Sequence, residues 1–347
     1  MFLLTLAFLA LLGIACQKPK PEVKKLPPRT KLQIFALDEI RTSGFETVVL
    51  KDFADQHNTA LKLTLFPDFP ALLTALNSPG NRGKVDLVLG VDNAFAITDS
   101  LLDVFSPVPE VALTEISFEV PKDPSRRLIP YAYSHMALVF NAKVVSQPPQ
   151  SFGELQDSRF YSQLAICDPL TTGLGRSSLL WSVSLFGDGG FDQLWTSLRK
   201  NIRKVYPDRW VALEALRKGE CGLMLGLQSA PAWVAEFFPA ENNIQAVIPQ
   251  EGSFLFVESA ALCNGAPNRA TGLDFLRYLI SADVQKFVMF KLGLLPVNGR
   301  TPLIRTFEAI PKNAFAHNQR LNKNLAREQL PLWLESWNRM NNRLPGF

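Results

Sequence analysis

The loop formed by residues 168–178 (DPLTTGLGRSS) brings hydroxyl groups and glycines together where a predicted strand gives way to a helix. Free backbone N–H groups and hydroxyls at the start of a helix bind anions such as phosphate or carboxylate, and glycine lets a ligand approach the backbone closely. The loop lacks the Gly-Lys-Ser/Thr of a P-loop and the third glycine of a dinucleotide fingerprint. Thr171, Thr172 and Gly173 are therefore candidate ligand contacts, although such a loop is also typical of a plain connection between a strand and a helix.

Two tryptophans follow predicted strands. Trp210 comes after YPDR at the start of a helix, and Trp233 comes after QSAP, in which Gln228 and Ser229 supply polar groups. Indole rings set opposite acidic side chains suit a planar, cationic ligand. Packing in a core is the alternative interpretation for each tryptophan.

Acidic side chains supply the complementary charge. Asp38, Asp68 and the neighbours Asp92 and Asn93 stand just beyond the ends of predicted strands. Asp68 lies among apolar residues, and capping of the following helix explains it as well as ligand binding does. Glu258 lies inside a predicted strand, where it occupies either a buried site or a solvent-facing position.

Alternating strands and helices place these residues on an α/β fold. Residues 32–37, 60–66 and 85–90 predict three strands separated by helical segments. In an open α/β sheet the ligand site lies beyond the carboxyl ends of the strands. The run 128–145 (LIPYAYSHMALVFNAKVV) predicts a buried strand that passes from one lobe to another. A cleft between two lobes is where ligands are usually held.

The remainder of the chain repeats the pattern in a second lobe. Strands are expected at 164–167, 202–206, 221–226 and, as a return crossing, 254–261, with helices at 177–186, 191–199, 210–218 and 231–237. Helices follow at 268–280 and 283–292 and in an amphipathic tail around Trp333, Leu334 and Trp337. A chain of 347 residues exceeds one ordinary core. We expect one lobe from residues 32–130 plus 259–347 and the other from 131–258.

The N-terminus predicts export. Residues 1–16 (MFLLTLAFLALLGIAC) form an apolar segment that ends in Gly13-Ile14-Ala15-Cys16, which resembles the lipobox of bacterial lipoproteins. Cys16 is then the lipidated residue that anchors the protein to a membrane, in the periplasm or at the cell surface. An ordinary cleaved signal peptide is the alternative. Residues 17–31 are rich in proline and lysine and predict a semi-rigid tether of up to about 45 Å.

The charge and the cysteines exclude several functions. The net charge of +4 arises in the tether, which carries six Lys or Arg and one acid, so the folded part is near neutral and gives no support for nucleic-acid binding. Cys167, Cys221 and Cys263 have the wrong spacing for a zinc site, and no other metal or cofactor is indicated. Cys167 and Cys221 could form a disulfide in an exported protein, but buried thiols are the preferred interpretation.

Several segments, in order along the chain, resemble the thiamine-binding proteins of bacterial ABC importers. They are DLVLGVDN (86–93), IPYAYSHMALVFNAK (129–143), CDPLTTGLGRSSLLW (167–181), YPDRWVALEALRKGECGLMLG (206–226), SAPAW (229–233), FVES (256–259) and LLPVN (294–298). The resemblance covers residues 32 to about 345. It implies the class II periplasmic binding protein fold, in which two α/β lobes close over a ligand, and a monomer that delivers this ligand to a membrane permease.

The resemblance also implies roles for individual residues. Asp68 corresponds to the acid beside the amino-pyrimidine ring of the ligand, and Trp210 to an indole of the site. Thr171 and Thr172 correspond to the hydroxyl loop on the phosphate side. Tyr133 and His135 correspond to tyrosines of the crossing strand.

Three positions depart from the family pattern. Leu37, Leu227 and Gly293 stand where the resemblance leads us to expect two tyrosines and a tryptophan. Each lost aromatic stack is worth on the order of 0.5–2 kcal/mol. The expected ligand is therefore thiamine, a phosphorylated thiamine or a related small cation.

Two other uses of the fold are weaker hypotheses. A secreted thiaminase resembles these receptors but uses a cysteine of the crossing region, and residues 128–145 contain none. Ser134 and His135 are adjacent on a predicted strand and point to opposite faces, so an enzyme is not expected. A sensor or a partner-binding lipoprotein on the same fold is the remaining alternative.

Overall fold

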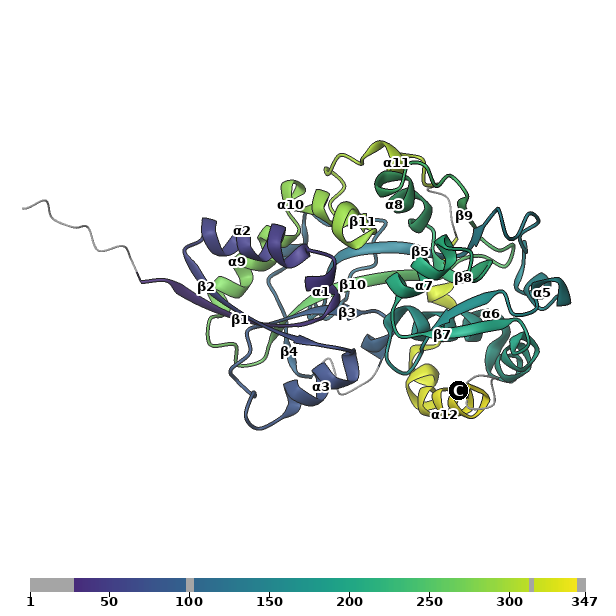
Figure 1. Ribbon diagram of the computed structural model, residues 1–347. Coiled ribbons are helices and arrows are strands. Elements are labelled where there is room, and N and C mark those ends of the chain that lie inside the picture. The colour runs from purple at the N-terminus through teal and green to yellow at the C-terminus, as the bar shows by residue number, and fades with distance from the viewer. Residues whose placement is uncertain (1–27, 98–102, 312–314, 342–347) are drawn as a thin grey trace, which may run out of the picture.

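The computed structural model describes residues 28–97, 103–311 and 315–341, and it shows two α/β lobes connected by long strands (Figure 1). A single path of hydrogen-bonded strands runs through both lobes in the order β2-β1-β3-β10-β5-β8-β6-β7. This confirms the expected α/β fold. The predicted signal peptide, Cys16 and most of the tether lie outside the described residues.

The first lobe is built on three parallel strands. These are β1 (Thr30–Leu37), β2 (Thr59–Phe66) and β3 (Leu87–Asp92), and Ile34 of β1 pairs with Leu63 on one side and Leu87 on the other. Helices α1 (Glu39–Thr42), η1 (Glu46–Leu50), α2 (Lys51–Gln56) and α3 (Phe69–Asn77) connect and cover them. Strand β1 begins inside the segment expected to be tether, because Thr30 and Lys31 already pair with β2.

Two long strands connect the lobes. Strand β5 (Ile129–Asn141) and strand β10 (Leu255–Cys263) run antiparallel, with Tyr133 opposite Val257, and both are almost wholly buried. Strand β5 continues into the second lobe, where Met136 pairs with Leu227 of β8. Short strands extend the sheet at its margins: β4 (Phe105–Ser106), β9 (Ile244–Val247) and β11 (Leu295–Pro296).

The second lobe repeats the parallel arrangement. Strand β6 (Leu164–Cys167) lies between β7 (Ile202–Tyr206) and β8 (Leu223–Leu227). Its helices are α5 (Phe152–Leu155), α6 (Gly173–Leu198), α7 (Arg209–Arg217) and α8 (Ala230–Phe237). Helix α6 covers both helices expected between residues 177 and 199, and it is kinked between them at Gly187, where φ is 71°.

The C-terminal helix contacts both lobes. After α9 (Arg269–Leu279), α10 (Ala282–Phe287), η5 (Val288–Leu292) and α11 (Arg305–Glu308), helix α12 (Lys323–Asn341) lies against α6 of the second lobe. Trp337 meets Trp195 edge to face, with ring centroids 4.9 Å apart. Near its other end, Arg327 donates to the carbonyl of Ile97 in the first lobe. The grouping of residues 259–347 with the first lobe stays a prediction, and the indoles of α12 face α6 of the second lobe. Short 3₁₀ segments complete the chain: η2 (Phe95–Ile97), η3 (Glu110–Leu113), η4 (Ser158–Phe160) and η6 (His317–Arg320).

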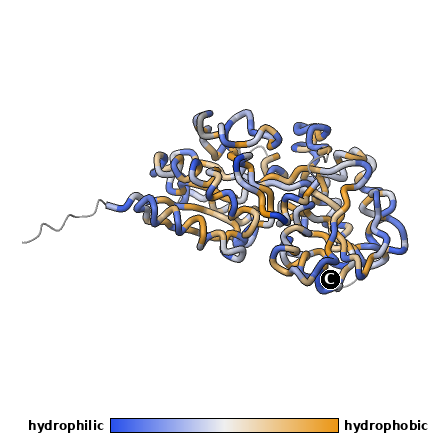
Figure 2. Tube along the Cα trace, turned by 90° about the horizontal axis from the view of Figure 1, so that it is seen from above, coloured by the Kyte–Doolittle hydropathy of each residue, from blue (hydrophilic) through white to orange (hydrophobic). Residues whose placement is uncertain are grey.

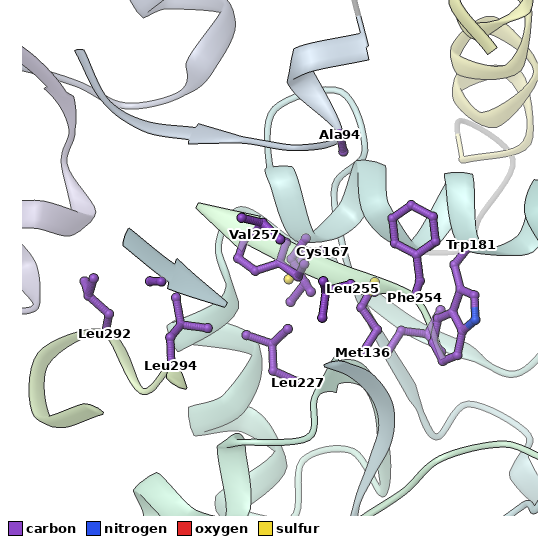
Figure 3. Close-up of a cluster of buried hydrophobic side chains, with 14 of the residues drawn as sticks. Ala94, Met136, Cys167, Trp181, Leu227, Phe254, Leu255, Val257, Leu292 and Leu294 are labelled. Atoms are coloured by element: carbon purple, nitrogen blue, oxygen red, sulfur yellow. The ribbon is translucent and has the colours of Figure 1, made fainter. Parts of the chain in front are cut away.

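The core follows the strands. Hydrophobic segments gather inside both lobes and hydrophilic segments lie outside (Figure 2), and a buried cluster around Met136, Leu227 and Leu255 joins the lobes (Figure 3). Cys167, Cys221 and Cys263 are buried and free. This confirms that they are apolar core residues and excludes the disulfide between Cys167 and Cys221. Among the described residues, none of the helices has the length and apolarity needed to span a membrane.

Candidate functional site

A cavity of about 700 Å³ lies between the lobes at the carboxyl ends of the parallel strands. Its lining includes residues that directly follow β1, β2 and β7 and the loop after β6, as the rule for open α/β sheets predicts. Lining residues from the first lobe and the crossing strands are Leu37, Asp38, Glu39, Thr42, Ser43, Pro67, Asp68, Gly90, Asp92, Phe256 and Glu258. The other side is formed by Thr171, Thr172, Gly173, Leu174, Pro207, Asp208, Arg209, Trp210, Val211, Trp233 and Phe237, and Phe290 and Lys291 complete the lining.

Most of the residues singled out from the sequence meet at this cavity. They are Asp38, Asp68, Asp92, Thr171, Thr172, Gly173, Trp210, Trp233 and Glu258. The structure thus brings together side chains from seven separate stretches of the chain. Their roles in ligand binding remain predictions.

Five other candidates lie outside the lining: Asn93, Tyr133, His135, Gln228 and Ser229. Asn93 bonds to the backbone of Leu255 and Val257 in β10, and Ser229 donates to the carbonyl of Gly293. Gln228 donates to the carbonyl of Pro311. These three side chains hold segments of the fold together, so their predicted ligand contacts would require a rearrangement.

Asp68 caps a helix, as one of its two interpretations predicts, and it can still bind a ligand, as the other predicts. Its Oδ1 atom accepts a hydrogen bond from the backbone N–H of Ala71 at 2.8 Å and caps helix α3. Its Oδ2 atom has no hydrogen-bond partner among the described residues. One carboxylate oxygen of Asp68 can therefore fix the helix while the other accepts a hydrogen bond from a ligand amino group.

Four residues form a cluster across the cavity, which we call the lobe-bridging cluster: Glu39, Arg209, Trp210 and Glu258. Glu39 of α1 accepts a 2.8 Å hydrogen bond from the indole N–H of Trp210 and pairs with Arg209, both of α7. Arg209 lies over the Trp210 ring at 4.6 Å, and its Nη2 atom is 4.0 Å from Oε1 of Glu258. The first lobe thus contacts the second through a partly buried ion pair.

Sequence reasoning missed Glu39 and Arg209. Each is adjacent to a residue that was selected, Asp38 and Trp210, and adjacency to a strand end is the signal that could have found them. Glu258 is buried, and burial together with the nearby Glu39 carboxylate raises its pKa. The hydroxyl of Tyr131 donates to Glu258 at 3.0 Å.

The start of helix α6 meets the first lobe at Asp92. The Thr172 hydroxyl caps the helix by accepting from the N–H of Gly175 at 3.0 Å. A Cβ atom placed on Gly173 would lie only 2.0 Å from Oδ2 of Asp92, so glycine is needed where the lobes touch. Asp92 Oδ1 accepts hydrogen bonds from the N–H groups of Ala94 and Phe95. A carboxylate of the protein itself therefore lies against the loop that was predicted to hold an anion.

Burial of Asp92 predicts a pH-dependent stability. Desolvation raises its pKa from 3.8 to about 6, although the two backbone N–H groups and Arg176 oppose the shift. The folded state thus binds the proton more tightly than the unfolded state. The resulting stabilisation, about 3 kcal/mol, is present below the unfolded pKa and is lost as the pH rises through about 6.

Asp92→Asn should remove this part of the pH dependence, because an amide oxygen still accepts from both N–H groups and no longer ionises. Urea unfolding from about pH 4 to 7 checks the prediction. Relative to the wild type, the variant should gain stability as the pH rises. A stability difference that stays constant over this range would contradict it.

Other aromatic side chains line the cavity, although Leu37, Leu227 and Gly293 replace the aromatic residues expected from the family pattern. Gly293 adopts φ of 60°, and a Cβ there would lie 3.2 Å from Trp233 and 3.3 Å from Trp210. The space next to the missing tryptophan is thus filled by two indoles, whose ring centroids are 4.7 Å apart. Further aromatic lining comes from Phe237, Phe256 and Phe290.

The lining is acidic. It contains six carboxyl groups, from Asp38, Glu39, Asp68, Asp92, Asp208 and Glu258, against the basic groups of Arg209 and Lys291. No group of three or more potential ligands among the described residues is placed to hold a metal ion. An acidic, aromatic cavity of this size suits a small organic cation.

Two α/β lobes with crossing strands and a ligand-sized cavity between them define a two-lobed solute receptor. The chain belongs to the bacterial extracellular solute-binding protein family, whose sequence model matches residues 83–339. It is 28% identical over 308 residues to the thiamine-binding periplasmic protein of Haemophilus influenzae, covering 88% of this chain and 91% of that one. It is 29% identical over 318 residues to the protein of the same name from Escherichia coli K12, covering 90% and 94%.

Solved structures agree with the sequence relatives. A periplasmic thiamin binding protein superposes with a TM-score of 0.76 at 26% identity, covering 92% of this chain and all of that one. A periplasmic binding protein from Actinobacillus pleuropneumoniae, solved with fructose-6-phosphate bound, gives 0.73 at 13% identity, with coverage of 90% and 99%; this second likeness shows the fold alone. The class II fold and the resemblance stated from the sequence are both confirmed.

Proposed function

We propose that this protein is the receptor of an ABC importer, that it binds thiamine in the cavity between the lobes, and that it delivers this ligand to a membrane permease. The observation that carries the proposal is the convergence of Asp68 and Glu39 from one lobe and Trp210 from the other on a single cavity of about 700 Å³. The names of its relatives point to the same ligand.

The binding mode follows from the chemistry of the lining. The free oxygen of Asp68 accepts from the amino group of the pyrimidine, while the indoles of Trp210 and Trp233 and the surrounding carboxylates hold the thiazolium cation. Contacts to both lobes favour the closed arrangement, so ligand binding and hinge closure are coupled. Binding and release need no covalent chemistry. The protein acts as a monomer that is exported to the periplasm or the cell surface and lipid-anchored through Cys16.

The cavity favours the unphosphorylated form of the ligand. Asp92 places a carboxylate against Gly173, in the first turn of α6, where a ligand phosphate would otherwise bind. Like charges at such a distance repel, and the nearest basic group of α6, Arg176, is buried and stacked on Phe95. We therefore infer that thiamine binds more tightly than its monophosphate or diphosphate.

Thermal unfolding of residues 28–347 with thiamine, thiamine monophosphate or thiamine diphosphate, each at about 100 μM, tests the proposal. A ligand at 100 times its dissociation constant stabilises the folded state by about 2.7 kcal/mol, which shifts the midpoint by a few degrees. Asp68→Ala should weaken thiamine binding about 30-fold, because a hydrogen bond between a carboxylate and the ligand is lost.

Asp157→Ala is the matched control. Asp157 also caps a helix through its carboxylate, but it lies outside the cavity, so its loss should leave the thiamine shift unchanged. If none of the three compounds shifts the midpoint, thiamine is not the ligand and the proposal fails.

A further inference from the structure

Arg209 sits inside the cavity as a planar cation among the groups proposed to bind one. Its side chain is 10% exposed, and its guanidinium lies 4.6 Å from the centre of the Trp210 ring. It pairs with Glu39 across the cleft, and Glu258 is 4.0 Å away. An indole face with carboxylates beside it is the environment that an organic cation requires. In this structure the protein supplies that cation itself.

The internal cation uses groups that a ligand would need. Glu39 accepts from both Arg209 and the indole N–H of Trp210, and the same indole packs against Trp233. A ligand ring cannot lie on the Trp210 face covered by Arg209, or use the charge of Glu39, while Arg209 stays in place. Ligand binding at this end of the cavity therefore requires the guanidinium to move.

Arg209 is placed so that it can leave. It is the first residue of α7, and the preceding Asp208 caps the helix through the N–H groups of Trp210 and Val211, so the cap does not depend on the Arg209 side chain. Its Nε atom is buried without a hydrogen-bond partner among the described residues, so that the guanidinium is only partly satisfied where it lies. Release into water removes this deficit.

We propose that Arg209 is a specificity-determining residue: it acts as an internal cation that bridges the lobes of the empty receptor and is replaced at Glu39 by the cation of the ligand. This inference rests on the proposed function for the nature of the ligand. A cationic ligand re-pairs Glu39 when Arg209 leaves. A neutral ring of similar shape leaves the partly buried Glu39 carboxylate without a cationic partner, which disfavours its binding.

The test compares a cation with a neutral fragment of the same molecule. Thiamine and the neutral 4-amino-5-hydroxymethyl-2-methylpyrimidine are titrated calorimetrically into the wild type, Arg209→Gln and Glu39→Gln. Arg209→Gln removes the competitor and should tighten thiamine binding about tenfold, with affinity for the pyrimidine changed less than about twofold. Glu39→Gln removes the acceptor and should weaken thiamine binding by about tenfold or more.

A second measurement needs no ligand. Small-angle X-ray scattering of the empty protein should show a larger radius of gyration for both variants than for the wild type, because the pair between the lobes is lost. If thiamine gives no binding heat with any form, the proposed function fails, whereas the scattering still decides whether Arg209 bridges the lobes. An unchanged radius of gyration for both variants overturns the bridge.

Arg217→Gln is a matched control on the same helix. Arg217 also pairs with two glutamates, Glu214 and Glu241, and lies 3.3 Å over the ring of Phe238, but all these partners belong to the second lobe and lie outside the cavity. Its loss should change neither the affinity nor the radius of gyration. If Arg209→Gln weakens thiamine and the pyrimidine to the same extent, Arg209 is part of the binding wall and the proposal is wrong.

Discussion

Gly173→Ala should lower ligand affinity about 30-fold, which corresponds to the roughly 2 kcal/mol cost of forcing an extra methyl group into a packed contact. The added Cβ atom would lie 2.0 Å from Oδ2 of Asp92. Two backbone N–H groups hold that carboxylate, so it cannot easily yield. The lobes must therefore part at the start of α6, and the closed arrangement is penalised. Calorimetric titration with thiamine measures the loss.

Two companion variants separate closure from a general effect on α6. Gly189→Ala adds the same methyl group to the same helix, where no atom lies within 4 Å of it, and should bind as the wild type does. Asp92→Ala combined with Gly173→Ala restores room and should recover part of the affinity, a coupling that a double-mutant cycle quantifies. Wild-type affinity in Gly173→Ala would show that the liganded lobes do not approach this closely.

Trp337→Ala should lower the free energy of unfolding by about 3–5 kcal/mol, as expected for truncation of a large buried aromatic side chain. Trp337 is 1% exposed and meets Trp195 of α6 at a ring angle of 81°. Its removal leaves a cavity between α12 and α6 that neither rigid helix can fill. Urea unfolding followed by circular dichroism gives the measurement.

Leu332→Ala serves as the control, because Leu332 lies on the other face of α12 and is 56% exposed. Its effect should stay within about 0.5 kcal/mol. An equally small effect for Trp337→Ala would mean that α12 contributes little to stability where it lies.

Much of the fold could be predicted because local patterns of apolar residues indicate its strands and helices. The alternation of apolar residues in 60–66 and the apolar run at 85–90 correspond to β2 and β3. The short strand β9 was missed, since its four residues form part of the sheet only by pairing with β5. The docking of α12 on α6 was also beyond local reasoning, because it depends on contacts between side chains far apart in the sequence.

The residues of the candidate site also differ in whether the sequence could reveal them. Asp68 and Trp210 could be found because strand ends converge in an open α/β sheet, whatever the details of packing. Glu39 and Arg209 were missed, although each is adjacent to such a residue, because a charged residue on a short amphipathic segment has the pattern of a solvent-facing one. Their meeting joins positions 170 residues apart and depends on how the two lobes pack against each other.

The buried cysteines have a practical consequence for observing this closure in solution. Burial raises the pKa of Cys221 and Cys263 to about 12 and that of Cys167 further still, so almost none of their thiols are in the reactive thiolate form at neutral pH. Maleimide dyes will therefore leave all three untouched in the native fold. In residues 28–347, a single cysteine introduced on each lobe can carry a fluorophore pair without removal of these three thiols, and energy transfer between the dyes then reports the opening and closing of the receptor directly.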